Sequence, residues 1–223
     1  MGSSRLSGKI FKMIGSQSLL GNVLGRLQSL KTPHLTVVAT TDQERDDCVE
    51  GFCKEEAVEC FRGSEENVLE RYYKCASLYN FDQIVRLTAD NPFTDIEELD
   101  RLIELHFSES YEFSYSFDQL PLGVGAEMFS FSALERSYYK AESAYHREHV
   151  DEYILDYPEK FKIARLSVPE QKRRPDLRLT VDTLEDLHCA RYIVEHSQEE
   201  WVRTEEAIQL AIKYSSERKS LSR

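Results

Sequence analysis

The chain has 223 residues, with 28 Lys and Arg against 40 Asp and Glu, and a formal net charge of −12 at pH 7. A chain of this length can bury a sizeable core as one domain and needs no disulfide or metal staple to fold. The negative balance excludes nucleic acids and anionic membrane surfaces as expected partners, because both are bound through clustered cations.

The sequence has no apolar run long enough to span a bilayer, and its first residues lack the apolar core of a secretory signal. The expected compartment is therefore the cytoplasm. The cysteines form no C-x-x-C pair, so we expect reduced thiols without a chemical role. They are Cys48, Cys53, Cys60, Cys75 and Cys189.

Leucines and valines recur at helical spacing over 19–30, and Pro33 closes that segment. The run 34–40 is short, β-branched and apolar on both faces, as buried parallel strands tend to be. Helices and strands are then predicted to alternate. The elements predicted for this half are a helix over 19–30, a strand over 34–40, a helical segment over 42–54, a strand over 57–61, a helix over 68–76, a strand over 83–87 and a helix over 96–107.

From Tyr111 the pattern loosens, and a glycine-containing turn follows at 121–125. Strands alternating with helices predict right-handed crossovers and a mainly parallel sheet. We expect one domain over 1–214, followed by a flexible tail over 215–223. The elements predicted here are a strand over 127–131, helices over 134–142 and 147–155, strands over 161–168 and 177–181 joined by a basic linker at 171–175, and helices over 184–195 and 204–214.

The first residues form a glycine- and serine-rich segment with two cations. Small residues let backbone N–H groups turn inward, and Arg5 and Lys9 add positive charge, which suits a di- or triphosphate. The alternative is an ordinary flexible terminus. The segment consists of Gly2, Ser3, Ser4, Arg5, Leu6, Ser7, Gly8 and Lys9.

Asp90 and Asp182 each follow a predicted strand. Ligands of such sheets bind at the carboxyl ends of parallel strands, and two carboxylates that meet there could share one Mg²⁺, which prefers oxygen ligands. Each could instead be structural, Asp90 as a helix-capping residue. For Asp95 we favour the capping role, at the start of the helix over 96–107.

Two further groups are candidates for binding a substrate. Glu127 follows the turn at 121–125 and could accept hydrogen bonds from sugar hydroxyls, or it could be an ordinary carboxylate at a strand edge. Arg147, Glu148 and His149 offer a cation, a carboxylate and an imidazole. At the start of a helix, however, Glu148 would also suit the helix dipole, and the imidazole could merely be packed.

Seven sequence blocks, taken in order, resemble the SpsF-like cytidylyltransferase family, whose wider relatives are the CMP-sialic acid and CMP-Kdo synthetases. The resemblance extends from Gly2 to about Ile193. The blocks are G-S-S-R-L-S-G-K, V-V-A-T-T-D, F-R-G-S-E-E-N-V-L-E-R-Y, V-R-L-T-A-D-N-P-F-T-D, P-L-G-V-G-A-E-M-F-S, R-E-H-V and R-L-T-V-D-T-L-E-D.

The resemblance implies an α/β protein with a three-layer α/β/α sandwich, the nucleotide-diphospho-sugar transferase (GT-A-like) fold. It implies nucleotidyl transfer, in which a sugar hydroxyl attacks the α-phosphorus of CTP and pyrophosphate leaves. By position, Gly2 to Lys9 would hold the triphosphate, with Arg5 and Lys9 as cations. Asp90 and Asp182 would hold Mg²⁺. Facing the sugar would be Glu127, Arg147, Glu148 and His149.

Two departures from the family pattern qualify these expectations. Ser7 replaces a proline of the family, which loosens the loop, since proline pre-sets the backbone. The family also carries a hydrophobic strand before the position of Met1, so the sheet is expected to lack the family's first strand. The alternatives are a glycosyltransferase that uses a preformed nucleotide sugar, or a degenerate, non-catalytic member of the family. A homodimer is the expected assembly.

Overall fold

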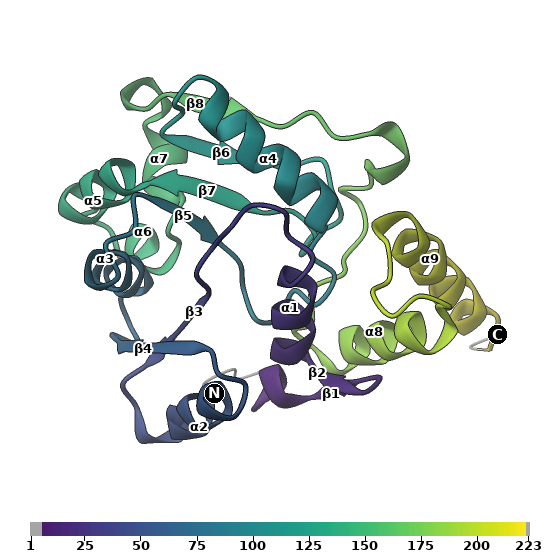
Figure 1. Ribbon diagram of the computed structural model, residues 1–223. Coiled ribbons are helices and arrows are strands. Elements are labelled where there is room, and N and C mark those ends of the chain that lie inside the picture. Colours follow the sequence, from purple (N-terminus) through teal and green to yellow (C-terminus); the bar gives the residue numbers. More distant parts are fainter. Residues whose placement is uncertain (1–5, 222–223) are drawn as a thin grey trace.

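The computed structural model describes residues 6–221 and has helices on both faces of a β-sheet (Figure 1). The strand β7 shows how the layers are built. Met128 packs into one apolar cluster, and its neighbour Phe129 packs into another. Because successive side chains of a strand point to opposite faces, the two clusters cover opposite faces of the sheet. The predicted three-layer α/β/α sandwich is therefore confirmed.

The largest sheet has four strands in the order β5–β7–β6–β8. β7 runs antiparallel to β5 and β6, whereas β6 and β8 are parallel. Three of the four strands therefore share one direction. Its strands are β5 (Gln83–Arg86), β6 (Phe113–Tyr115), β7 (Glu127–Ser130) and β8 (Ile163–Arg165).

Two smaller sheets complete the described strands. β3 (Val37–Thr41) and β4 (Glu59–Gly63) form a parallel pair, and β1 (Met13–Ile14) pairs antiparallel with β2 (Gln17–Ser18). Within residues 6–221 no strand joins β3 to β5. This agrees with the expectation that the sheet lacks the family's first strand.

Polar side chains cap most of the long helices. Asp95 accepts a hydrogen bond from the backbone N–H of Glu98 and caps α4, as predicted. None of the described helices is both long and apolar enough to cross a membrane. The helices are α1 (Leu19–Leu27), α2 (Asp47–Glu55), α3 (Val68–Leu78), α4 (Ile96–Ser108), α5 (Phe131–Lys140), α6 (Ala144–Glu148), α7 (Glu152–Asp156), α8 (Leu184–His196) and α9 (Thr204–Leu221), with 3₁₀ turns η1 (Lys9–Phe11), η2 (Glu44–Asp46), η3 (Pro158–Lys160) and η4 (Glu170–Lys172).

The structure corrects three of the predicted elements. Residues 177–181 form no strand: they bond to the loops at Leu122 and Asp90 and make one isolated bridge. The helix predicted over 147–155 is two short helices, α6 and α7, because the chain is extended at His149. The predicted last helix over 204–214 continues to Leu221, and its final turns contact α8 through the hydrogen bond from Tyr192 to Glu217.

His106 is a buried imidazole that should make stability depend on pH. Its Nε2 donates to Gln83 Oε1 and its Nδ1 accepts from the Ser114 hydroxyl, each at 2.9 Å. Burial lowers the pKa of His106 to about 4. Between this value and the ordinary pKa of about 6.5, the unfolded chain binds a proton that the folded chain does not. The stability that the neutral His106 contributes, about 3 kcal/mol, is therefore complete above pH 6.5 and is lost as the pH falls toward 4.

The measurement is urea unfolding between pH 7 and pH 4.5, with the chain compared with His106→Gln. The substitution should remove part of the fall in unfolding free energy over this window. Equal slopes for the two proteins would contradict the prediction. The matched control is His34→Gln, in which the replaced imidazole is exposed, and it should leave the slope unchanged.

Candidate active site

Lys9 joins the two aspartates that the sequence singled out. Its Nζ lies 2.5 Å from Asp90 Oδ2 and 2.6 Å from Asp182 Oδ1. The three side chains are 15%, 23% and 21% exposed, so they are shielded yet reachable from solvent. The chain thus brings residues 9, 90 and 182 to one point. That Asp90 and Asp182 would lie together was predicted; that Lys9 would lie directly between them was not.

Lys9 is held by a turn that the glycine before it makes possible. Gly8 caps η1 with φ 63° and ψ 24°, a left-handed conformation that favours glycine. Of the predicted phosphate-binding segment, Gly8 and Lys9 can be placed. The remaining predicted residues of that site, Gly2, Ser3, Ser4 and Arg5, lie outside the described residues.

The loops that carry the two aspartates are tied together through the backbone. Asp90 O accepts a hydrogen bond from Val181 N at 2.9 Å. Asp182 then lies beside the capping box of α8, in which Thr183 and Asp186 each bond to the other's backbone N–H. This network sets where the two carboxylates meet.

Arg178 and Asp186 complete the immediate surroundings of Asp182. Arg178 forms ion pairs with Asp182 and with Asp186. Asp186 Oδ2 also accepts from the Asp182 backbone N–H at 3.0 Å. Arg178 therefore adds a second cation to the site, and Asp186 positions the loop.

Electrostatic interactions keep Lys9 and Asp182 charged. Burial by itself would raise the pKa of Asp182, but Lys9 and Arg178 outweigh it and hold the pKa below its usual value. Burial would likewise lower the pKa of Lys9, yet Asp182 and Asp90 raise it. At neutral pH Lys9 is therefore an ammonium and Asp182 a carboxylate.

Gly123 fills the narrow space between the two loops. Its φ is +92°, and a Cβ added there would lie 2.7 Å from Thr180 N and 2.9 Å from Asn91 Oδ1. Both neighbours adjoin the loops that carry Asp90 and Asp182. Only glycine fits this position without moving one of the loops.

Gly123→Ala should therefore destabilise the fold by about 1–3 kcal/mol, from backbone strain and the close contacts. Urea unfolding measures the change. The matched control is Gly51→Ala, because Gly51 lies in α2 with nothing within 4 Å of an added Cβ. That substitution should stabilise by up to about 1 kcal/mol, since alanine favours a helix. Equal effects at the two positions would refute the packing argument.

Glu127 is buried in an ion pair with Arg86. Burial raises the pKa of Glu127 to about 8, Asp151 adds to the rise, and Arg86 opposes it. One carboxylate oxygen, Oε2, is buried without a hydrogen-bond partner within the described chain. A sugar-binding role for Glu127 stays a prediction.

The block Arg147–Glu148–His149 lies at the end of α6. Glu148 was expected at a helix start and is instead the last residue of its helix, so the helix-dipole reading is wrong. The side chains of Arg147 and Glu148 are exposed, and the His149 ring packs 4.7 Å from that of Tyr145. Within the described residues no hydrogen bond or ion pair links this block to Lys9, Asp90 or Asp182. Its role toward a sugar also stays a prediction.

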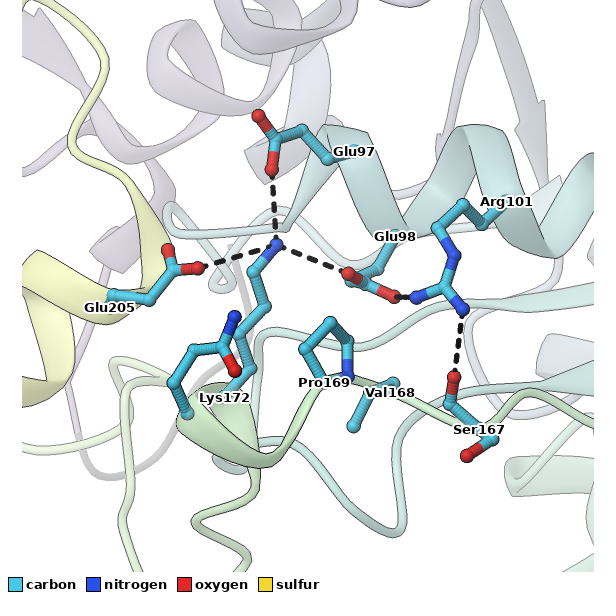
Figure 2. Close-up of a pocket in the computed structure, with 9 residues that line it drawn as sticks. Glu97, Glu98, Arg101, Ser167, Val168, Pro169, Lys172 and Glu205 are labelled. Carbon is cyan, nitrogen blue, oxygen red and sulfur yellow. Dashed lines mark hydrogen bonds and ion pairs between the residues drawn. The ribbon is translucent and has the colours of Figure 1, made fainter.

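A polar pocket of about 470 Å³ surrounds Lys172, apart from the Lys9 site (Figure 2). Figure 2 shows the ammonium of Lys172 pointing toward three glutamates, Glu97 and Glu98 of α4 and Glu205 of α9. The residue was predicted to lie in a basic linker, and its side chain is only 3% exposed. Its partners explain the burial and indicate a structural role.

Comparisons with known proteins found a matching family model and similar chains. A family model described as cytidylyltransferase matches residues 1–218. The chain is 36% identical over 204 residues to the spore coat polysaccharide biosynthesis protein SpsF of Bacillus subtilis, covering 89% of this chain and 85% of that protein. It is 37% identical over 195 residues to an uncharacterized protein of Methanocaldococcus jannaschii, covering 87% of this chain and 80% of that one.

Solved structures extend the likeness to the fold. A cytidylyltransferase from Leptospira borgpetersenii superposes with a TM-score of 0.88 at 33% identity, over 97% of this chain and 92% of that one. A CMP:2-keto-3-deoxy-manno-octonic acid synthetase complexed with CTP superposes with a TM-score of 0.66 at 16% identity, over 87% and 94%. The second likeness shows a shared fold.

Proposed function

The chain belongs to the cytidylyltransferase family and is a nucleotidyltransferase, and we propose that it transfers CMP from CTP to an acidic, ulosonic sugar. Two similar proteins support the sugar class: the relative SpsF is named for spore coat polysaccharide biosynthesis, and a structural neighbour is a CMP:2-keto-3-deoxy-manno-octonic acid synthetase. The product would serve surface or spore coat polysaccharide biosynthesis.

In the proposed reaction, a sugar hydroxyl oxygen bonds to the α-phosphorus of CTP. The bond from that phosphorus to the bridging oxygen of the β-phosphate breaks, so pyrophosphate leaves with the electron pair and the hydroxyl proton passes to solvent or a neighbouring base. Such a transfer asks the protein mainly for positioning and for neutralisation of charge. The observation that carries the proposal is the convergence of Lys9, Asp90 and Asp182 on one point.

Lys9 would neutralise charge on the triphosphate. Its ammonium is held by carboxylates on two loops, so an incoming phosphate could take over the contact and leave the carboxylates free. Gly8 and Lys9 would form the described part of a phosphate-binding loop. The predicted contributions of Gly2, Ser3, Ser4 and Arg5 remain proposals.

Asp90 and Asp182 fit a Mg²⁺ site. Their oxygens Oδ2 and Oδ1 lie within 2.6 Å of one cation, the Lys9 ammonium, which shows that they can converge on a shared positive charge. Mg²⁺ prefers oxygen ligands and is commonly held by one or two carboxylates together with substrate phosphates. When bound, the ion would neutralise charge that develops on the transferring phosphoryl group. Asp90 and Asp182 would hold it, and Arg178 would keep Asp182 oriented.

The test is release of pyrophosphate from CTP in the presence of Mg²⁺ and a panel of ulosonic acids, compared with ATP, GTP and UTP. Release that requires both CTP and an acid supports the proposal. If no acid gives release but a nucleotide sugar is turned over, the chain is a glycosyltransferase. If calorimetry shows no CTP binding with Mg²⁺ present, it is a non-catalytic member of the family.

A further inference from the structure

Lys9 lies at the point where Asp90 and Asp182 would hold a metal ion. Its Nζ is 2.5 Å from Asp90 Oδ2 and 2.6 Å from Asp182 Oδ1, so one ammonium fills the space between the two oxygens. Mg²⁺ binds carboxylate oxygens at about 2.0–2.1 Å. An ion that bound these two oxygens together would therefore lie against Nζ, and the two positive charges would repel each other. A lysine ammonium has three donors and no acceptor, so it cannot become a ligand of that ion. The ammonium and the metal ion thus exclude each other at this pair of oxygens.

Both carboxylate oxygens of Asp182 face a cation. Lys9 contacts Oδ1, and the guanidinium of Arg178 pairs with Oδ2. Arg178 also pairs with Asp186, which accepts a hydrogen bond from the Asp182 backbone and so ties the arginine to the same loop. A divalent ion that approaches Asp182 must therefore displace one of two cations. Lys9 is the one that also blocks Asp90.

The turn that carries Lys9 lets its ammonium leave while the backbone stays in place. The turn η1 follows Gly8, and none of its three residues is buried. Its other two residues, Ile10 and Phe11, pack against a small apolar cluster that includes Leu20, which anchors the backbone of the turn. The lysine side chain is 15% exposed and has a flexible four-carbon stem. Rotation of the stem can therefore move the ammonium from the carboxylates to a bound anion without rearranging the core.

A triphosphate is the kind of anion that would compete for this ammonium. It offers several charged oxygens, and charge-assisted contacts between lysine and phosphate are among the stronger hydrogen bonds of proteins. Once Lys9 has moved to the phosphates, the carboxylates of Asp90 and Asp182 are open to a cation. Mg²⁺ is commonly held by one or two carboxylates together with substrate phosphates. Each ligand therefore removes what opposes the binding of the other.

We propose that Lys9 holds the place of the metal ion until a nucleotide binds: its ammonium keeps free Mg²⁺ off Asp90 and Asp182, and the triphosphate draws it away, so that nucleotide and metal ion bind cooperatively. In the nucleotide-free chain the ammonium also keeps the two carboxylates from facing each other without a cation. The inference rests on the proposed function for the identity of the anion, a nucleoside triphosphate. A permanent structural ion pair would give neither the exclusion nor the cooperativity.

Binding of Mn²⁺ to the chain without nucleotide tests the exclusion. Mn²⁺ takes the same oxygen ligands as Mg²⁺, and electron paramagnetic resonance follows its free concentration. Lys9→Met should bind Mn²⁺ about tenfold more tightly than the unsubstituted chain, a coupling of ordinary size. Lys12→Met is the matched control, since it removes the same charge from an exposed side chain, and it should change the affinity by less than about twofold. Adding Asp182→Asn to Lys9→Met should abolish the gain, because it removes a ligand of the ion.

Binding of CTP in the presence of EDTA tests the same exchange from the nucleotide side. Lys9→Met should bind CTP about tenfold more weakly than Lys12→Met, because it lacks the cation that receives the triphosphate. One substitution is thus expected to strengthen metal binding and to weaken nucleotide binding. A purely structural role of Lys9 would weaken both.

Equal or weaker Mn²⁺ binding by Lys9→Met overturns the proposal, and so does unchanged CTP binding. A gain in Mn²⁺ affinity that persists after Asp182→Asn also overturns it, because the ion then binds elsewhere. If thermal unfolding shows that Lys9→Met does not fold, Lys9→Gln gives the same comparison, and failure of both to fold would make the lysine a permanent structural partner and overturn the proposal. Neither measurement uses a sugar. Opposite shifts for Mn²⁺ and CTP without pyrophosphate release from any acid would uphold this inference and refute the proposed reaction, whereas release with equal Mn²⁺ affinities would do the reverse.

Discussion

Lys9→Met should lower kcat/KM for CMP transfer by about 10²–10³-fold, the usual loss when one preorganised charged donor is removed from a site of phosphoryl or acyl transfer. Lys9 Nζ is the one described cation that contacts Asp90 and Asp182 together, and a methionine of similar length cannot replace its charge. The substitution also leaves two carboxylates facing each other, which weakens the site for a polyanion. We therefore expect CTP affinity to fall along with the rate.

Lys12→Met is the matched control, because it removes the same charge three residues away from an exposed side chain. It should retain nearly full activity. Pyrophosphate release and calorimetric titration with CTP measure the two effects, and thermal unfolding shows whether each variant is folded. If Lys9→Met and Lys12→Met are equally active, Lys9 does not take part and the proposed site is wrong.

Asp182→Asn separates the role of the carboxylate from that of the ammonium. If Asp182 holds Mg²⁺, the variant should need a higher Mg²⁺ concentration for half-maximal activity. If Asp182 only anchors Lys9, the Mg²⁺ dependence should stay the same while CTP affinity changes. The metal dependence is thus a readout that a purely structural role would not move.

Much of this site could be predicted because the sequence places polar residues where strands end. Asp90 follows β5 after three residues, and Asp182 precedes the strong capping signal of Thr183 and Asp186 at the start of α8. Ligands gather at strand ends in α/β sheets, so spacing alone indicated that the two carboxylates would approach each other. The direct contact with Lys9 was not predictable, since it depends on how a loop 81 residues away packs.

The errors in the predicted strands have a common physical cause. Residues 177–181 have the apolar alternation of a strand, but whether they form one depends on a partner, and they meet single loop residues instead. Conversely, β6 is three residues long and contains serine, so its composition gives a weak signal. Ser114 is tolerated in the core because its hydroxyl bonds to His106. Long helices with a regular apolar period, such as α4, can be predicted from their local sequence alone.

The buried environment of Lys172 could not be predicted from the sequence. Lys172 stands in a run with two arginine neighbours and a proline, typical of an exposed linker, yet its partners come from α4 and α9. Lys172 Nζ lies 2.9 Å from Asp95 Oδ2 and 3.2 Å from Glu98 Oε1, and both carboxylates are at most 5% exposed. Burial alone would lower the pKa of Lys172, but these carboxylates raise it above its ordinary value.

Lys172→Met should destabilise the fold by about 3–5 kcal/mol, because it removes the cation that pairs with the buried Asp95 and leaves Glu98 with Arg101 as its remaining cation. Urea unfolding measures the loss, and Tm should fall by about 10 °C. Arg203→Met is the matched control: it breaks an ion pair with Glu97 in which both side chains are about 60% exposed, and such pairs contribute about 0–1 kcal/mol. Equal losses for the two variants would contradict the buried network.

A double variant tests whether the stability lost in Lys172→Met comes from the stranded carboxylates. Lys172→Met combined with Glu98→Gln removes the cation together with one of the charges that it neutralises. If the uncompensated charge causes the loss, the double variant should be more stable than Lys172→Met alone, with a coupling energy of about 0.5–3 kcal/mol. If the loss instead comes from the packing of the lysine stem, the second substitution should add to the damage. The sign of that coupling therefore decides between charge and packing as the reason why a lysine is buried between α4 and α9.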